Sequence, residues 1–224
     1  ARARTYDRTL LLIAAALLAL GVLFSMAASP AATARIRIEE AFYFAARQAA
    51  YAGLGVVVML WAASLEPRAL RRAATVLAAL MLPLCALAGW IGPEVKGAQR
   101  WFDFGPFSLQ PSELLKPALI VVWAWMLSES MKRPNVPGRA VALGLFALAA
   151  AALLTQPDLG QTAMLALTLA PMLFLSGMAL RWLLGGAALM ALAARAIYQF
   201  FPHARERWDA FMGDPEWQRI KQET

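Results

Sequence analysis

Charge is scarce in this sequence, and cysteine and histidine are almost absent. Asp, Glu, Lys and Arg make up 16% of the 224 residues, whereas soluble domains carry about 25%. The single cysteine, Cys85, excludes an intramolecular disulfide. The single histidine, His203, has no histidine or cysteine partner in the sequence, so the residues predict no metal site. The sequence also lacks phosphate-binding glycine loops, nucleophile elbows and dinucleotide-binding fingerprints.

Hydrophobic residues make up 61% of the chain and lie in long blocks between short charged segments. A helix that crosses a bilayer core of about 30 Å needs roughly 20 mainly apolar residues. The blocks therefore predict an all-α, polytopic membrane helix bundle that forms one integral membrane domain over residues 1–224. We expect seven spans, near residues 10–28, 48–65, 73–92, 114–127, 140–155, 163–180 and 183–201.

The positive charges predict the orientation of these spans. The net charge of +7 could indicate a nucleic-acid partner, but in so apolar a chain Lys and Arg mark the cytoplasmic ends of spans. Ten cations crowd into about thirty residues before span one and after spans two, four and six. The alternate connections hold nine in about seventy residues. This difference in density predicts a cytoplasmic N-terminus, with residues 202–224 on the outer face.

The connection between the third and fourth spans combines aromatic and polar residues. Its aromatic side chains, among them Trp101, suit a membrane–water boundary. Ser112 is predicted to cap the fourth helix, and Glu113 lies three residues before Lys116, close enough to pair with it. Lys116 either extends its ammonium group to the membrane surface or lines a functional cavity, because an ionisable residue at depth suggests function. The residues alone leave both interpretations open.

A second polar segment, residues 156–162, lies between the fifth and sixth spans. Asp158 is predicted to cap the sixth helix. This segment is either a structural turn or a set of amide and acid side chains that bind a polar headgroup.

At these residues the sequence resembles the SEDS family (shape, elongation, division and sporulation). The string from Gly97 to Asp103, followed by Gln110 to Lys116, resembles one signature of the family, and residues 156–162 resemble a second in the same order. Phe44, Arg47 and Gln48 resemble its entry to the second span, and residues 201–207 and 211–216 resemble the start of its large outer loop. The residues at 92–97 and 201–203 most resemble those of division-type members of the family from alphaproteobacteria.

The resemblance implies a ten-span peptidoglycan glycosyltransferase of the bacterial inner membrane that polymerises lipid II with inversion during septal wall synthesis. It also implies membrane lipid around the chain, and a class B penicillin-binding protein and other divisome proteins as partners; no nucleic acid is expected. The general base of the family, an Asp of the outer loop, would follow Thr224, so we expect a partial and inactive chain. The residues expected to bind substrate are Arg100, Trp101, Gln110, Ser112, Glu113, Lys116, Gln156, Asp158 and Gln161.

Two other functions stay open for such a chain. The same polar groups could serve a lipid II flippase, or the spans could form a non-catalytic membrane scaffold for the penicillin-binding protein. No cofactor is required by the residues. A divalent cation such as Mg or Mn is the one candidate, because the departing pyrophosphate needs positive charge.

Overall fold

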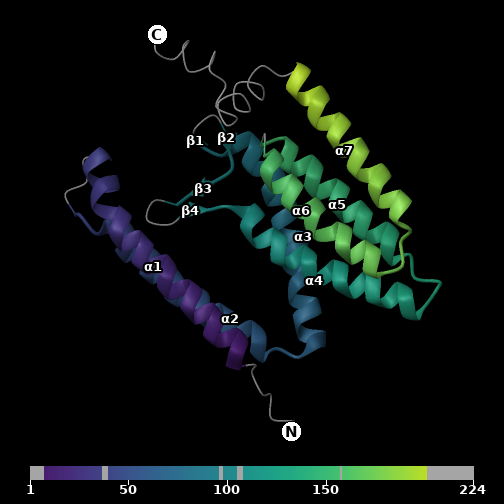
Figure 1. The fold of residues 1–224 in the computed structure, drawn as a ribbon, viewed down its shortest axis with the longest axis horizontal. Helices are drawn as coiled ribbons and strands as arrows, with labels where there is room; N and C mark the ends of the chain where they lie inside the picture. The colour runs from purple at the N-terminus through teal and green to yellow at the C-terminus, as the bar shows by residue number, and fades with distance from the viewer. Residues whose placement is uncertain (1–7, 37–39, 96–97, 105–107, 157, 201–224) are drawn as a thin grey trace. The chain divides into compact units, whose positions relative to one another are not determined.

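The computed structural model describes residues 8–36, 40–95, 98–104, 108–156 and 158–200 (Figure 1). Within these ranges the predicted all-α class is confirmed, because two-residue β-strands occur only between α3 and α4. The predicted outer loop and His203 lie outside the described residues. The helices are α1 (Arg8–Ile36), α2 (Tyr43–Ser64), α3 (Pro67–Ile91), α4 (Pro111–Lys132), α5 (Gly138–Leu154), α6 (Leu159–Leu175) and α7 (Leu180–Phe200).

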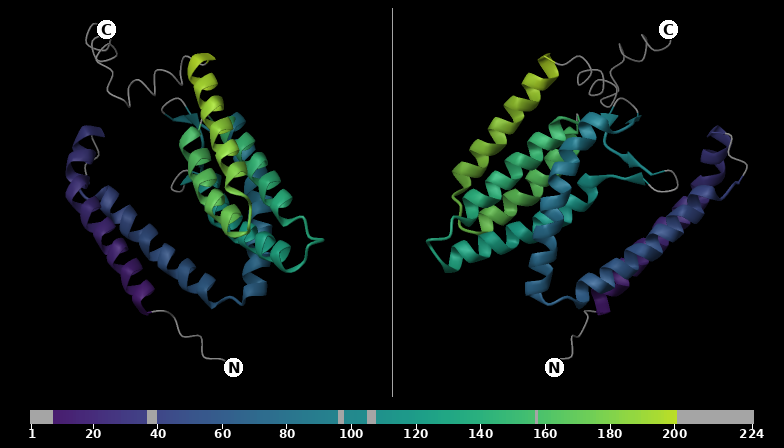
Figure 2. Two further views of the ribbon diagram at one scale, coloured as in Figure 1. Left: turned by 45° about the vertical axis from the view of Figure 1, so that its right-hand side comes forward. Right: turned by 180° about the vertical axis from the view of Figure 1, so that it is seen from behind.

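Two compact units divide the chain, Ala1–Leu70 and Arg71–Thr224. In the first unit, α1 and α2 pack side by side as an antiparallel pair (Figure 2). The connection between them is held by α1 side chains: the Ser29 hydroxyl donates to the Ala41 carbonyl at 2.9 Å. Thr33 is also buried there, and its hydroxyl donates to the Ser29 carbonyl at 3.0 Å. These bonds satisfy hydroxyl groups that lipid or protein would otherwise leave unpaired.

The core of the second unit lies between α3, α4, α5 and α6. A row of large side chains spaced four residues apart runs down α4: Leu115, Leu119, Trp123 and Leu127. Residues four apart share one face of a helix, so this row forms a continuous ridge. A matching row on α6 consists of Leu165, Leu169 and Leu173.

Small residues let the helices of this unit approach closely. Ala142 and Ala149 of α5 are fully buried against the core. A Cβ atom at Gly138 would overlap the Met126 carbonyl oxygen, so α5 begins in direct contact with the α4 backbone. Membrane helices commonly pack through small residues in this way, because lipid gives them no hydrophobic drive to associate.

Two β-hairpins fill the connection between α3 and α4. β1 (Glu94–Val95) pairs antiparallel with β2 (Ala98–Gln99), with Glu94 opposite Gln99. β3 (Phe102–Asp103) pairs antiparallel with β4 (Ser108–Leu109), with Phe102 opposite Leu109. Arg100 and Trp101 lie between the two hairpins.

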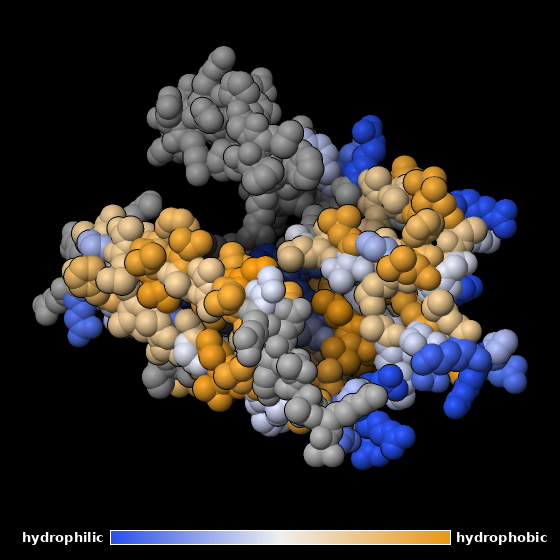
Figure 3. All heavy atoms as spheres, turned by 60° about the horizontal axis from the view of Figure 1, so that its bottom comes forward, coloured by the Kyte–Doolittle hydropathy of each residue, from blue (hydrophilic) through white to orange (hydrophobic). Residues whose placement is uncertain are grey.

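Within the described part of the chain, four helices are long and apolar enough to cross a membrane, over Thr9–Ala34, Tyr43–Ser64, Pro67–Ile91 and Pro111–Lys132. Three apolar helices are shorter, over Gly138–Leu154, Gly160–Leu175 and Leu180–Ala193. Large apolar side chains such as Leu17, Phe24 and Trp61 are exposed along the helices, and hydrophobic residues cover much of the face seen in Figure 3. Such surfaces are suited to lipid, and the chain is a multi-pass membrane protein.

One predicted boundary is wrong. The span expected over residues 163–180 is not continuous, because α6 ends at Leu175. Gly177 has a φ of +84°, a left-handed conformation that glycine adopts without strain. The Gly177 and Met178 N–H groups then donate to the Phe174 and Leu173 carbonyls at 2.9 and 3.1 Å, which closes the helix.

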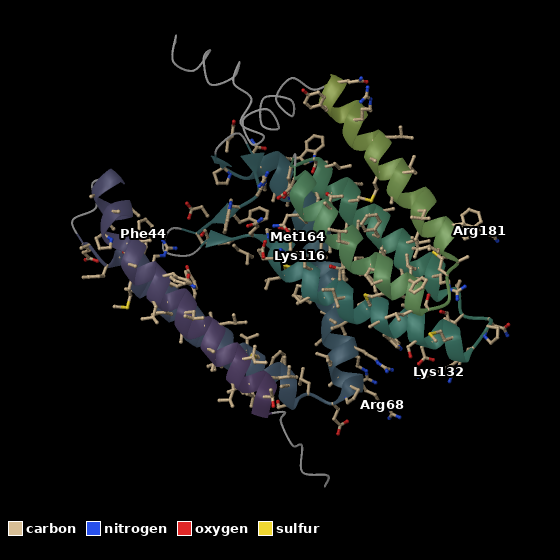
Figure 4. The ribbon with its side chains drawn as sticks, viewed as in Figure 1. Phe44, Arg68, Lys116, Lys132, Met164 and Arg181 are labelled. Carbon is tan, nitrogen blue, oxygen red and sulfur yellow. The ribbon has the colours of Figure 1, made fainter. Side chains whose placement is uncertain are left out.

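Cations lie where α3, α5 and α7 begin and where α4 ends. We call this the cation end: Arg71, Arg72, Lys132, Arg133, Arg139 and Arg181 (Figure 4 labels Lys132 and Arg181). The Arg71 guanidinium lies 4.0 Å from the Glu129 carboxylate and 5.7 Å from the Trp125 ring centre. Arg139 donates to the Ser176 hydroxyl at 3.3 Å, which ties the start of α5 to the end of α6. Cations predicted to share one side of the membrane thus lie on helix ends that are joined in space.

We expect the variant Gly89→Ala to unfold at a lower temperature than the wild type. A Cβ atom at Gly89 of α3 would lie 2.7 Å from the Thr155 hydroxyl oxygen and 3.2 Å from Gln156 Cγ. Alanine favours a helix by about 1 kcal/mol over glycine, but overpacking costs about 1–3 kcal/mol, so the clash outweighs the propensity. Thermal unfolding in detergent measures the difference.

Gly144→Ala is the matched control, because a Cβ atom at Gly144 of α5 would meet nothing within 4 Å. Its unfolding temperature should equal or exceed that of the wild type. Equal unfolding temperatures for Gly89→Ala and the wild type would contradict the close approach of α3 to the α5–α6 turn.

Candidate functional site

The predicted site residues begin at the first turn of α4. Pro111 occupies the first helical position, where its missing N–H costs nothing, so Gln110 is the N-cap. The prediction that Ser112 caps this helix is therefore wrong. Ser112 lies inside the first turn, is buried, and its hydroxyl accepts from the Gln110 side-chain amide at 3.0 Å. The proline just before it was the signal for the earlier start.

Lys116 lies one turn further along α4 and holds two partners. Its Nζ lies 2.9 Å from Glu113 Oε1, so the predicted pairing of these residues is confirmed. Nζ also donates to Gln161 Oε1 of α6 at 2.8 Å, and Gln161 Nε2 donates to Glu113 Oε1 at 3.0 Å. These three side chains form a closed triangle, which we call the lysine triangle. The Lys116 side chain is 18% exposed and that of Glu113 is 50% exposed, so the ammonium is the more sheltered group.

The turn between α5 and α6 carries the next group. Asp158 is the N-cap of α6, as predicted, and its Oδ1 accepts from the Gln161 N–H at 3.3 Å. Gln156 is buried, and its side-chain amide donates to the Cys85 carbonyl of α3 and lies 3.4 Å from the Cys85 sulfur. The turn is thus fastened to α3 on one side and to α6 on the other.

Arg100 joins this turn from the connection between the hairpins. Its Nε lies 3.3 Å from Asp158 Oδ2 and donates to the Gln156 carbonyl at 3.4 Å. The Arg100 and Asp158 side chains are 26% and 8% exposed, so the ion pair is partly removed from solvent. Shelter from water strengthens such a pair, and the polar contacts offset part of the cost of burying it.

Eight of the nine predicted site residues thus make specific polar contacts in the second unit. They form three groups: Gln110 with Ser112, the lysine triangle, and Arg100 with Gln156 and Asp158. The second and third groups meet in the first turn of α6, where the Gln161 N–H donates to Asp158. Trp101, the ninth, lies half-buried beside Arg100.

Sequence reasoning missed two members of this network. The sequence indicated only that Cys85 has no disulfide partner. In the structure its backbone carbonyl accepts a hydrogen bond from the Gln156 side chain, across 71 positions of sequence. Gly89 was not singled out, although its missing side chain makes room for Thr155 and Gln156. Both lie inside an apolar helix, where no local pattern marks which residue meets a distant turn.

The described site residues do not supply the clustered ligands of a metal site that is held by the protein alone. Over the described residues, no three His, Cys, Asp or Glu side chains gather at one place. The two carboxylates of the site are each held by a cation, Asp158 by Arg100 and Glu113 by Lys116. No step of the reaction proposed below depends on a metal.

Known proteins are similar to this chain in sequence and in fold. A family model described as cell cycle protein, which covers FtsW, RodA and SpoVE, matches residues 7–217. The chain is 41% identical over 210 residues to the probable peptidoglycan glycosyltransferase FtsW of Caulobacter vibrioides, covering 93% of this chain and 53% of the relative. It is 33% identical over 180 residues to stage V sporulation protein E of Bacillus subtilis, covering 76% and 48%. The chain spans about half the length of these curated relatives.

Two solved structures are also similar to this chain in fold. The crystal structure of the rod shape determining protein RodA of Thermus thermophilus is similar with a TM-score of 0.68 and 32% identity, over 84% of this chain and 60% of that one. A chain from a peptidoglycan synthase complex, solved for the structural coordination of polymerization and crosslinking, has a TM-score of 0.71 and 31% identity, over 96% and 62%. The chain belongs to the FtsW, RodA and SpoVE family of cell cycle proteins, the SEDS family.

Proposed function

We propose that this protein is a peptidoglycan glycosyltransferase that polymerises lipid II into glycan strands during septal wall synthesis. The observation that carries the proposal is the position of Lys116, whose ammonium is sheltered and fixed by two side chains from two helices. The name of the Caulobacter relative supports the reaction class.

The chemistry calls for a fixed cation. A sugar hydroxyl attacks an anomeric carbon; the new C–O bond forms as the bond to undecaprenyl pyrophosphate breaks, with inversion at that carbon. Negative charge grows on the departing pyrophosphate, and a preorganised cation stabilises it without the cost of reorganising water. Lys116 supplies this charge in the proposal, while the attacking hydroxyl gives its proton to a base that we do not assign to these residues.

The remaining site residues would orient the substrate or the cation. Glu113 and Gln161 hold Lys116, and Asp158 holds Arg100, whose planar guanidinium is suited to phosphate oxygens. We place Trp101 and Gln110 beside the sugars, and Ser112 and Gln156 behind them as buried supports.

We further propose the cellular setting. The cation end is placed in the cytoplasm of a bacterium and the lysine triangle toward the outer leaflet of the inner membrane, because cytoplasmic segments are enriched in Lys and Arg. A class B penicillin-binding protein and other divisome proteins are the proposed partners. Similarity to a chain of the synthase complex, in which polymerization and crosslinking are coordinated, supports this partnership.

Polymer formation from lipid II tests the proposed function. The protein expressed from its complete reading frame, with its crosslinking partner, is incubated with labelled lipid II in detergent, and products are separated by size. Long strands support the glycosyltransferase. Absence of strands in detergent, together with transfer of lipid II across vesicle bilayers, would replace it with a flippase. Neither activity, with recruitment of the penicillin-binding protein intact, would replace it with a scaffold.

A further inference from the structure

The side-chain amide of Gln161 contacts both members of the Glu113–Lys116 pair. Its carbonyl oxygen accepts from Lys116 Nζ at 2.8 Å, and its nitrogen donates to Glu113 Oε1 at 3.0 Å. The opposite orientation of the amide would place an N–H group against the ammonium and a carbonyl against the carboxylate. One orientation is therefore strongly preferred, and the amide is complementary to both charges.

The backbone of Gln161 is held as well. Its N–H donates to Asp158 Oδ1 at 3.3 Å, and the other carboxylate oxygen of Asp158 pairs with Arg100. Below this turn, Leu115 and Leu119 of α4 share a buried core with Leu165 of α6. The backbone of Gln161 is therefore fixed relative to α4, and its side chain contacts Lys116 from this fixed position.

The Glu113–Lys116 pair by itself would hold the ammonium loosely. The two residues are three positions apart on one helix, and the Glu113 side chain is half exposed. Ion pairs of this kind are weak, because water screens them and two long side chains must be ordered. A partner from a second helix is what restricts the ammonium to one place.

We infer that Gln161 is a positioning residue: it acts on the substrate through Lys116, by fixing the ammonium where a phosphate of the lipid-linked precursor binds. This inference rests on the proposed function for its substrate, while the hold of Gln161 on Lys116 can be measured without any reaction. It differs from direct binding of the substrate headgroup, the role that the sequence suggested for Gln161.

The test is the variant Gln161→Met in the protein expressed from its complete reading frame. Methionine keeps the length and the apolar contacts of glutamine but loses both hydrogen bonds. Thr168→Ala is the matched control on α6, because the exposed Thr168 hydroxyl donates to the Met164 carbonyl within the same helix.

Two readouts separate positioning from a general structural role. The first is the rate at which an amine-acylating reagent labels Lys116, divided by the rate for the exposed Lys132, measured by mass spectrometry. The second is the pair of KM and kcat for lipid II. We expect Gln161→Met to raise the labelling ratio about 3-fold or more and to lower kcat about 3- to 10-fold, with KM within about 2-fold, because the ammonium that stabilises the departing pyrophosphate loses a hydrogen bond that fixes it. Thr168→Ala should leave all three unchanged.

Other outcomes decide against the inference. A labelling ratio equal to that of the wild type would show that Gln161 does not hold Lys116. A higher KM with kcat unchanged would make Gln161 a direct contact of the bound substrate instead. If the wild-type protein makes no strands, the proposed function fails, while the labelling ratio still decides whether Gln161 holds the lysine.

Discussion

Lys116→Met is expected to lower the rate of strand formation by about 100-fold or more at saturating lipid II. The variant removes the ammonium that Glu113 and Gln161 hold at 2.9 and 2.8 Å. Removal of one preorganised group that stabilises transition-state charge costs about 10²–10³ in kcat. Initial rates of polymer formation from labelled lipid II measure the effect.

Lys132→Met is the matched control, because Lys132 is exposed at the cation end of the same helix. It should polymerise at the wild-type rate. Lys116→Arg separates charge from shape: it keeps the charge but replaces a compact ammonium with a planar fork, so we expect partial activity. A Lys116→Met protein with a rate within about 2-fold of the wild type would remove Lys116 from the mechanism.

Asp158→Asn is expected to lower both the unfolding temperature and the rate of strand formation. Asparagine caps a helix as well as aspartate, so this change keeps the bond to the Gln161 N–H and removes the negative charge 3.3 Å from Arg100 Nε. Hydrogen bonds to charged groups contribute about 1.5–3 kcal/mol, and the Asp158 side chain is only 8% exposed. We expect a loss of stability of about 2 kcal/mol and a rate at least about 10-fold lower, because Arg100 loses the carboxylate that holds it in place.

Two further variants isolate the ion pair. Asp158→Ala loses the cap as well, which should cost about 1 kcal/mol more than Asp158→Asn. Arg100→Met combined with Asp158→Asn should destabilise less than the sum of the single changes, because both remove the same interaction. Strict additivity in thermal unfolding would show that the pair contributes no stability.

The correctly predicted contacts of the site are those that depend on short sequence separation. Glu113 and Lys116 pair because residues three apart are neighbours on any helix, and Asp158 caps α6 because its carboxylate reaches the next turn. The error among the local contacts of the site, the cap at Ser112, arose because Pro111 takes the first helical position and moves the helix start toward Gln110.

The long-range contacts could not be predicted in this way. Lys116 meets Gln161 across 45 positions of sequence, and Gln156 meets Cys85 across 71. In a soluble helix an apolar stripe indicates the buried face, but a membrane helix is apolar on most sides because lipid is its solvent. The sequence therefore carries little sign of which face of α3 or α6 meets which neighbour.

The sequence by itself determined the helices, their approximate bounds and the membrane class, because these follow from apolar length, proline and glycine positions, and charge density along the chain. It also determined the family, through two polar segments in a fixed order. Only the tertiary structure decided that these segments meet, that Arg100 is held by Asp158, and that Gln161 holds Lys116. The physical reason is that such contacts depend on close packing between helices, and that packing arises from the sum of many small side-chain fits rather than from any local pattern.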